Sequence, residues 1–379
     1  MAAIRRGQSQ RAVARQWHVS IHTVQKWLTR AGGQRLDRVD WGDRREQGHA
    51  APNRTPTAVE AQVLALRIEL QRRSVLGEYG ARAIHQALQA RGASAPALRT
   101  IGRILRRRGV LDGRQRARRP PPPPGWHLPG VATRQQELDC FDFIEDLKLA
   151  GGPLLDVFTA VSLHGGLPGA WPLASASTTV TLDCLAAHWR THGRPSFAQF
   201  DNDTRFQGPH QHRDVIGRVS RCCLQLGITP VFVPPREFGL QNAIEQFNGL
   251  FLAKVWRRWR FPTLAALAAH SQHYVTALTT RRAARLAEAP ARTAWPLEWE
   301  FDAQLVPVAG ALIYIRRTNE RGDVGLLGRR WRIDPHWVHR LVRVELDLGR
   351  GEWRAYALRR SAPTEQPLLR QGSYEPRRP

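Results

Sequence analysis

The sequence predicts a multidomain chain, with α-helical units at the N-terminus, an α/β domain in the middle and a small β-barrel near the C-terminus. Three observations indicate this division. The chain has 379 residues, which is enough for two to four domains. Five consecutive prolines, Pro120 to Pro124, separate a first part with helical periodicity from a second part that is rich in strand patterns. The charge of the chain also changes at this boundary.

The formal net charge of +25 is unevenly distributed along the chain. Residues 1–130 carry 25 basic and 8 acidic side chains, residues 131–260 carry 13 and 12, and residues 261–379 carry 19 and 12. A first segment this basic repels itself unless a polyanion shares its surface, so nucleic acid is the expected partner. The composition argues against an enzyme that acts alone on small neutral metabolites.

Residues 1–31 are predicted to form a helix-turn-helix unit. Two short helices with a tight break fit residues 9–30, and Ser20 is a suitable cap for the second helix. An ordinary helical hairpin explains this pattern about equally well, and the surrounding positive charge favours DNA. In a helix-turn-helix the second helix reads the major groove, so the residues expected to contact DNA are His22, Gln25 and Lys26.

A second helix-turn-helix unit is predicted over residues 57–113, after a polar linker at 32–56. Thr57 and Glu60 form a capping box, and three helices follow at the spacing of a buried apolar stripe. The third helix ends in arginines that are either a solvated helix end or contacts to the DNA backbone. The Arg/Pro-rich linker at 114–130 favours DNA contact by Arg99, Arg103, Arg106, Arg107 and Arg108.

Residues 131–260 are predicted to form an α/β domain with a mixed sheet. Strands in series at the start, followed by alternating helices and strands, indicate this class. The expected strands are 138–147, 154–164, 167–173, 197–200 and 228–233, and the expected helices are 178–192, 215–226 and 241–260.

Three carboxylates of this domain are candidates for a metal site. Asp142 lies within the first strand, Asp201 ends a later strand, and Glu245 lies in the first turns of a helix. A cup of three carboxylates suits Mg²⁺, and two such ions support an in-line phosphodiester displacement. Surface charge at Asp142 and a helix-dipole role for Glu245 are the alternatives. Asp139 competes with Asp142, but the two residues face opposite sides of a regular strand, so only one can join the site.

Residues 137–258 resemble the integrase catalytic core of DDE transposases, the type found in insertion sequences and in retroviral integrases. Phe141-Asp142-Phe143 is similar to the first motif of that family, and Phe200-Asp201-Asn202-Asp203-Thr204-x-Phe206 to the second. Asn242-x-x-Glu245-x-x-Asn248 is similar to the third motif. The three motifs occur in the family's order and on the expected elements.

The resemblance implies an RNase H-like fold and a polynucleotidyl transferase that cuts DNA at element-end inverted repeats and joins it to target DNA. It implies two Mg²⁺ ions, replaceable by Mn²⁺, held by Asp142, Asp201 and Glu245. Asn202, Asp203 and Asn242 would support this site, with Asn242 on the same helix face as Glu245. Such an enzyme works as a homo-oligomer on double-stranded DNA, in the bacterial cytoplasm at the nucleoid.

Two other functions stay open from the sequence. Asp203 and Ala243 stand where the family usually has glycine, and the gap between Asp201 and Glu245 is longer than usual. These departures fit an inactive DNA-binding protein derived from a transposase. The RNase H-like fold alone also fits a stand-alone nuclease.

The C-terminal third is predicted to contain a helical extension at 261–300, an SH3-like β-barrel at 305–360 and a flexible tail at 361–379. Alternating residues from Val342 to Leu348 indicate the barrel strands, and Trp331, Trp337 and Trp353 are expected in its core. The four cysteines form no CxxC pair, which is typical of reduced thiols. The sequence predicts neither a signal peptide nor a membrane helix.

Overall fold

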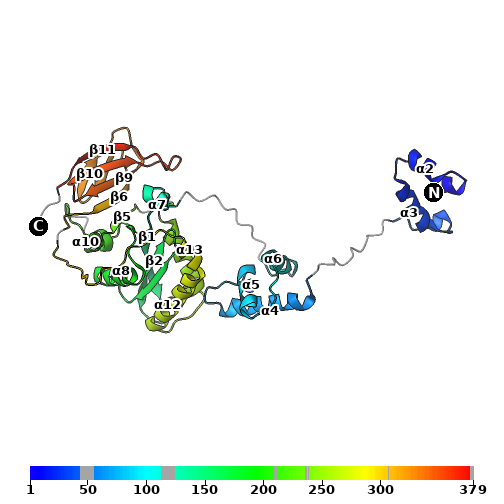
Figure 1. Ribbon diagram of the computed structural model, residues 1–379, viewed down its shortest axis with the longest axis horizontal. Coiled ribbons are helices and arrows are strands. Elements are labelled where there is room, and N and C mark those ends of the chain that lie inside the picture. Colours follow the sequence, from blue (N-terminus) through cyan, green and yellow to red (C-terminus); the bar gives the residue numbers. More distant parts are fainter. Residues whose placement is uncertain are drawn as a thin grey trace. The chain divides into compact units, whose positions relative to one another are not determined.

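The computed structural model describes residues 1–42, 55–111, 124–149, 151–208, 212–234, 237, 239–305 and 307–375 (Figure 1). Most of the predicted linker at 32–56 and most of the Arg/Pro-rich linker lie outside these residues. The chain divides into two compact units, Met1–Ala61 and Gln62–Pro379, which are considered separately below. In the described part of the chain, no helix is both long and apolar enough to cross a membrane.

The first unit contains the two predicted helices and additional ordered residues after them. The side chains of Ser9 and Ser20 accept hydrogen bonds from the first turns of α2 and α3, as expected of N-caps. The predicted linker begins too early, because Val39 is buried and Trp41 packs on Trp27 with ring centroids 5.7 Å apart. The elements are α1 (Ala2–Arg5), α2 (Gln10–Gln16), α3 (Ile21–Ala31) and the 3₁₀ turn η1 (Leu36–Arg38).

The second helical group has the three predicted helices around a small apolar core. Val63, Ile84 and Ile101 are fully buried in it, one from each helix. The arginines of the third helix, α6 (Leu98–Arg107), are exposed to solvent. The helices are α4 (Thr57–Arg73), α5 (Ala81–Ala90) and α6 (Leu98–Arg107).

A nine-stranded sheet forms the centre of the second unit, in the order β11-β10-β9-β6-β5-β4-β1-β2-β3. β1, β2 and β3 pair antiparallel, whereas β4 and β5 continue the sheet parallel to β1. This part is consistent with the RNase H-like core that the sequence motifs imply. Its strands are β1 (Leu138–Lys148), β2 (Leu154–Ser162), β3 (Pro168–Leu173), β4 (Phe197–Phe200) and β5 (Thr229–Phe232).

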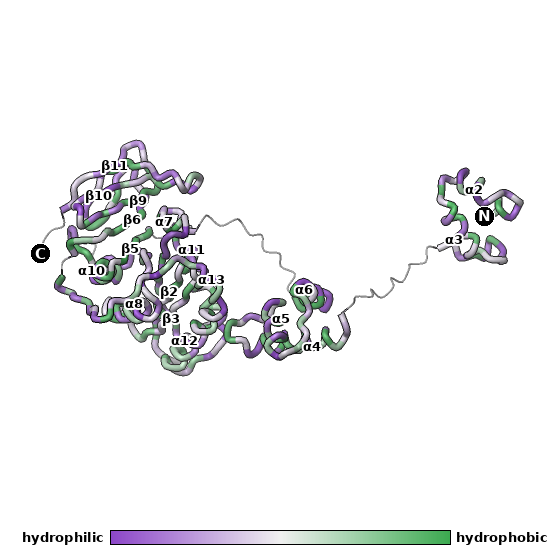
Figure 2. The backbone as a smooth tube through the Cα atoms, in the orientation of Figure 1, coloured by the Kyte–Doolittle hydropathy of each residue, from purple (hydrophilic) through white to green (hydrophobic). Residues whose placement is uncertain are grey.

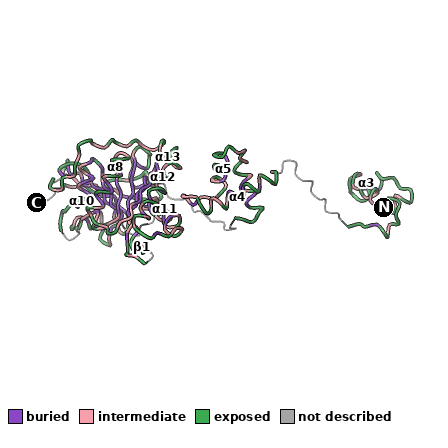
Figure 3. Tube along the Cα trace, turned by 90° about the horizontal axis from the view of Figure 1, so that it is seen from below, coloured by how far each residue is buried: buried purple, intermediate pink, exposed green. Residues whose placement is uncertain are grey.

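Helices cover both faces of this sheet, and the buried residues gather along its strands (Figure 3). One face packs against α8 and α10 through residues such as Trp189 and Cys222. The other packs against α11 and α12 through residues such as Phe247 and Tyr274. The helices are α7 (Pro129–Ala132), α8 (Thr178–His192), α9 (Thr204–Gln207), α10 (Arg218–Gln225), α11 (Asn242–Phe251), the π-helical turn η2 (Leu252–Trp256), α12 (Leu264–Arg281) and α13 (Ala283–Ala287).

Two predicted boundaries of the core are wrong. The Arg/Pro-rich linker was expected to extend to residue 130, but Trp126, His127 and Leu128 are buried against the sheet. The helical extension was expected to reach residue 300, but α13 ends at Ala287, and an extended segment that pairs with Arg194 follows it.

The C-terminal strands join the core sheet, and no separate closed barrel is formed by the described strands. β6 pairs parallel with β5, and β9, β10 and β11 continue antiparallel from it. The short hairpin of β7 and β8 forms its own two-stranded sheet. Hydrophobic residues of β6 and β9 therefore extend the core (Figure 2). The strands are β6 (Ala311–Arg317), β7 (Asp323–Leu326), β8 (Arg329–Arg332), β9 (Leu341–Asp347), β10 (Glu352–Ala357) and β11 (Leu368–Ser373).

The predicted flexible tail at 361–379 is also wrong in its described part. Residues 368–373 form β11 on the edge of β10, and Tyr374 is only 1% exposed. Tyr374 packs on Trp331, whose own ring contacts Trp353. The three tryptophans Trp331, Trp337 and Trp353 are buried, which confirms their prediction as core residues.

Removal of the Tyr374 ring is expected to destabilise the protein strongly. Tyr374→Ala leaves a cavity against Trp331, and loss of a buried aromatic ring costs about 3–5 kcal/mol. The Tyr374 hydroxyl is buried without a hydrogen-bond partner among the described residues, so Tyr374→Phe should leave stability unchanged or slightly raised. Denaturant unfolding of the two variants measures this, and equal stabilities would contradict the packing.

Candidate active site

The pairing of β1 with β4 brings Asp142 and Asp201 side by side. Cys140 lies opposite Gln199 in this parallel pair, and the same register continued by two residues puts Asp142 opposite Asp201. Adjacent strands lie about 4.8 Å apart, so the two carboxylates begin from neighbouring backbone positions. Each residue lies two positions beyond a residue on the face covered by α11, so both carboxylates share that face.

Helix α11 completes this arrangement through Asn248. Its side-chain amide donates a hydrogen bond to Asp142 Oδ2 at 2.9 Å. The hydroxyl of Thr159, on β2, lies within hydrogen-bond distance of two acceptors, Asn248 Oδ1 at 2.7 Å and the backbone oxygen of Asp142 at 2.9 Å, and its single proton serves one of them at a time. These bonds hold the amide with its NH₂ group toward the carboxylate. Asp142 therefore has a fixed orientation without a cationic partner.

The sequence assigned the supporting role to Asn242, but Asn248 is the asparagine bonded to Asp142. Asn242 is exposed at the start of α11 and lines a separate cavity with His127 and Gln246. Asn248 belongs to the third sequence motif. The feature that could have identified it as the supporting residue is its position one helical turn beyond Glu245. That spacing puts Glu245 and Asn248 on the same side of α11.

Glu245 is exposed, and its charge affects Asp142 less than that of Asp201 does. It is the last of the charges that raise the pKa of Asp142. In the described residues, no group of three acidic, histidine or cysteine side chains is arranged closely enough to hold a metal ion. The structure thus brings Asp142 and Asp201 together but does not bring Glu245 into the same cluster.

Asp203 caps the short helix α9, and its charge helps to raise the pKa of Asp201. It accepts hydrogen bonds from the backbone N–H of Arg205 at 2.7 Å and from the Arg205 side chain at 2.5 and 3.0 Å. Arg205 also bonds Glu145 at 2.5 Å and lies over the ring of Phe143. The aspartate at this position, where glycine is usual in the family, therefore forms an ion-paired cap.

Asn202 is bonded within the same loop. The side chain of Gln207 donates a hydrogen bond to Asn202 Oδ1 at 2.7 Å. The backbone N–H of Asp203 donates to Asp201 Oδ1 at 2.9 Å, and this bond closes the turn after β4. Asn202 and Asp203 thus shape the loop that carries Asp201.

The two central carboxylates disfavour each other's charge. Burial and the charges of Asp201, Glu145 and Glu245 together raise the pKa of Asp142 to about 7, although a hydrogen bond from the backbone N–H of Phe143 opposes the shift. Burial also raises the pKa of Asp201, although the backbone N–H of Asp203 and the charge of Arg205 oppose this shift. Two partly buried carboxylates with raised pKa values are stabilised by a cation that binds between them.

The chemistry of this donor set fits the Mg²⁺ that the sequence motifs imply. Hard divalent cations prefer carboxylate oxygens, and Asp142 and Asp201 offer four such oxygens from adjacent strands. Asn248 orients Asp142 by donating a hydrogen bond to its Oδ2, as the hydrogen-bond partner of a metal ligand does. Asp142 and Asp201 would hold the ion, with Glu245 the nearest additional carboxylate on α11.

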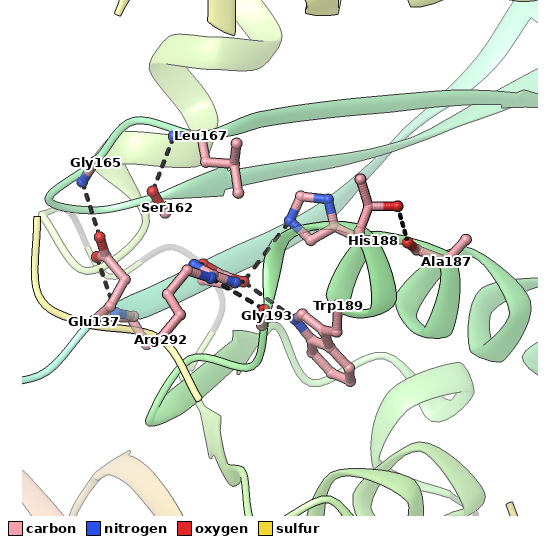
Figure 4. Close-up of polar contacts among 12 residues, drawn as sticks. Glu137, Ser162, Gly165, Leu167, Ala187, His188, Trp189, Gly193 and Arg292 are labelled. Atoms are coloured by element: carbon pink, nitrogen blue, oxygen red, sulfur yellow. Dashed lines mark hydrogen bonds and ion pairs between the residues drawn. The ribbon is translucent and has the colours of Figure 1, made fainter. Parts of the chain in front are cut away.

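Asp139 belongs to a different, structural cluster on the opposite face of β1. Arg292 donates to both Asp139 oxygens, at 2.9 and 2.6 Å, and Trp189 Nε1 donates at 3.1 Å. Figure 4 shows Arg292, Trp189 and His188 converging on this point, with Glu137 nearby. Burial alone would raise the pKa of Asp139, but the charge and hydrogen bonds of Arg292 outweigh burial, so this pKa is lowered.

The predicted DNA-contacting residues all lie on exposed surfaces. His22, Gln25 and Lys26 lie on the outer side of α3 in the first unit. The arginines of α6 and its end are exposed in the second unit, at positions 99, 103, 106, 107 and 108.

The α4–α5 connection in the second unit is bonded to the catalytic region through backbone oxygens. Lys254 donates to the oxygen of Gly77, and Arg258 donates to those of Ser74 and Gln71. Sequence reasoning missed these contacts, because a carbonyl oxygen carries no residue-specific signal.

No protein-family model and no curated protein matches this chain. Solved retroviral integrase structures are similar to it. The catalytic core domain of BIV integrase is 17% identical over 37% of this chain and 82% of its own, with a TM-score of 0.29.

Two further solved structures are similar to this chain. A chain of the simian T-cell lymphotropic virus intasome in complex with PP2A regulatory subunit B56 gamma is 14% identical over 69% of this chain and 87% of its own, with a TM-score of 0.32. The HTLV-2 integrase catalytic core in complex with magnesium, in its dimeric form, is 14% identical over 37% and 84%, with a TM-score of 0.28. The likeness of this chain to an RNase H-like core is therefore based on the order and direction of its own strands.

Asp142 and Asp139 are expected to respond to pH in opposite directions in metal-free protein. The pKa of Asp142 is raised above its unfolded value, so its stabilising contribution is present at low pH and is lost as pH rises through about 7. Asp142→Asn should therefore melt several degrees above wild type at pH 8 in a chelator, but not at pH 5. Added Mg²⁺ should stabilise wild type and leave Asp142→Asn unchanged.

Asp139→Asn is the matched control on the other face of the same strand. The lowered pKa of Asp139 means that its contribution is present at neutral pH and is lost on acidification. This variant should melt well below wild type at pH 8, because it leaves Arg292 buried without a charge partner. Thermal melts of both variants at the two pH values test the assignment, and equal behaviour would contradict it.

Proposed function

We propose that this chain is a DNA transposase of the insertion-sequence type with an integrase-like catalytic core. It binds the inverted repeats at the ends of its element, cleaves DNA there and joins the freed end to target DNA. The observation that carries this proposal is the pairing of Asp142 and Asp201 on adjacent parallel strands, with Asn248 of α11 bonded to Asp142. The three residues come from the three sequence motifs of the family.

In phosphoryl transfer, the residues of this chain have two tasks: carboxylates bind the metal ion, and neighbouring side chains fix the orientation of those carboxylates. Mg²⁺ bound at the site supplies activation of the attacking oxygen and stabilisation of the leaving oxygen. Asp142 and Asp201 bind it, and Asn248 and Thr159 keep Asp142 in a single orientation. The first attack is by water at the element end, and the second is by the resulting 3′-OH on target DNA. No covalent protein–DNA intermediate is required, so no serine or tyrosine is assigned as nucleophile.

The helical groups supply the DNA recognition in this proposal. His22, Gln25 and Lys26 of α3 read base edges at the element end, as in a helix-turn-helix. The exposed arginines of α6 contact phosphates without reading sequence. Two element ends must be joined in one event, so the active species is a homo-oligomer assembled on DNA.

Loss of one central carboxylate should abolish strand transfer. Asp201→Asn is expected to reduce the rate on an end-bearing duplex by about a thousandfold, since metal-ion stabilisation of the transition state is worth several kcal/mol. Asp203→Asn, two residues away, should keep most activity, because Asp203 caps α9 and pairs with Arg205. The assay uses Mg²⁺ or Mn²⁺ and separates cleavage from joining on a gel.

The outcomes of this assay separate the candidate functions. Cleavage without joining would favour the nuclease, and absence of both in wild type that binds the ends would favour the inactive DNA-binding protein. If wild type and Asp201→Asn react equally, the transposase assignment fails.

The first unit should determine sequence preference but not general affinity. Deletion of residues 1–42 is expected to remove the preference for element-end DNA over random DNA, because the major-groove contacts lie on α3. A weaker, salt-sensitive affinity should remain through the arginines of the second unit. Competition binding with the two DNA sequences measures the ratio, and an unchanged preference would exclude α3 as the reading helix.

A further inference from the structure

A basic cavity lies beside the loop that carries Asp201. It has a volume of about 490 Å³ and is lined by Asn202 and Gln207, by Arg316 of β6 and by residues 325–330 of the β7–β8 hairpin. Neither Asp142 nor Asp201 lines this cavity. The sequence motifs assigned no role to Arg316 or to this hairpin.

The parallel register explains why Arg316 lies near the catalytic loop. Phe200 of β4 lies opposite Phe232 of β5, and Phe232 lies opposite Tyr314 of β6. The three rings also contact one another in this order. Asn202 and Arg316 each lie two residues further, so they reach the same level of the sheet two strands apart. Two strand spacings amount to about 10 Å.

Arg316 is a half-buried cation that makes no ion pair with a carboxylate of the described residues. Its Nη1 donates to the backbone oxygens of Phe232 and Ile315, at 3.2 and 2.8 Å, and its guanidinium lies over the Tyr314 ring. Burial lowers the pKa of Arg316 to about 10, which keeps it charged at neutral pH. Its described partners are backbone oxygens and an aromatic ring, so its charge is available to an anion that enters the cavity from outside the chain.

The hairpin adds a second arginine that is not neutralised. Arg329 pairs with Asp214 and Arg332 pairs with Asp323, whereas Arg330 makes no ion pair with a described residue. Gly325 faces open space, since a Cβ added there would meet nothing within 4 Å. The cavity therefore offers two cationic side chains and an unobstructed wall.

We propose that this cavity is a phosphate-binding subsite for the DNA strand, with Arg316 as its anchor and Arg330 at its rim. This rests on the proposed function, because DNA is taken as the source of the phosphate. The planar guanidinium of Arg316 binds two phosphate oxygens at once. Arg316 lies two strand spacings from Asn202 in the loop of Asp201, about 10 Å, so this phosphate would be a neighbour of the reacting one on the same DNA.

The test is the salt dependence of DNA binding by the full chain. Fluorescence anisotropy with a labelled duplex should give a log–log salt slope that is about 0.9 smaller in Arg316→Gln than in wild type, the value for one lost phosphate contact. Affinity at low salt should fall roughly tenfold. Arg317→Gln is the matched control, because Arg317 is the next residue on β6 and pairs with Glu237.

A second pair of variants keeps the test valid if Arg316→Gln does not fold. Gly325→Glu puts a carboxylate into the cavity, where it takes the place of the phosphate, and should weaken binding as much as Arg316→Gln. Gly325→Ala fills the same open space without charge and should bind as wild type does. Arg330→Gln should lower the salt slope by a similar amount, since this side chain is exposed and tolerates change.

The outcomes distinguish this subsite from the proposed activity. Unchanged slopes in Arg316→Gln, Arg330→Gln and Gly325→Glu would overturn the subsite even if strand transfer is normal. If the variants lower the salt slope while the wild-type protein neither cleaves nor joins DNA, that result would support the subsite and overturn the proposed activity. Stabilisation by inorganic phosphate at constant ionic strength, without any effect of the variants on duplex binding, would assign the cavity to free phosphate and exclude the DNA strand.

Discussion

The parallel pairing of β1 with β4 is the constraint on which the rest of the catalytic region depends. It is a short contact, with Leu138, Asp139 and Cys140 opposite Phe197, Ala198 and Gln199. Because side chains alternate between the two faces of a strand, this register decides which acid of β1 meets Asp201. A slip of one residue would move Asp142 to the face of α8 and Asp139 to the face of α11. The pairing therefore determines which aspartate of β1 lies beside Asp201, in addition to the order of the strands.

The two acids of β1 meet opposite environments. Asp139 is completely buried and is neutralised by Arg292, whereas Asp142 is bonded to a neutral amide and faces another carboxylate. A buried carboxylate with a bidentate arginine is stable by itself and has no capacity for a further cation. A carboxylate oriented by an amide keeps its charge available. Among the described residues no arginine pairs with Asp142, which leaves its charge available to the metal ion of the proposed function.

Most secondary structure was predictable, because the helices have capped starts and periodic apolar faces; the bounds of α8 and β4, for example, match the prediction. Asp142 and Asp201 were predictable from motifs and strand alternation. The association of β6 with β5 could not be predicted. A strand with alternating hydrophobic residues, such as β9, has the same sequence pattern in a separate barrel as in an extended sheet. The pairing of Asp203 with Arg205 and the choice of Asn248 depend on side-chain direction, which spacing alone leaves open.

The union of β6 with the core sheet also bears on how an acidic site accepts a polyanion. In the proposed function, Asp142 and Asp201 would repel a phosphodiester until a cation is bound, so they would contribute nothing to the initial binding of DNA. Attraction must come from cations close enough to position the strand but far enough not to neutralise the carboxylates. Parallel strands bring their carboxyl ends to one edge, and β6 adds Arg316 to the edge where Asp201 lies, with β5 between them. In the proposed function, a sheet extended in this way would separate the attraction of DNA from catalysis by two strand spacings, in keeping with a strongly basic chain whose residues 131–260 are nearly neutral.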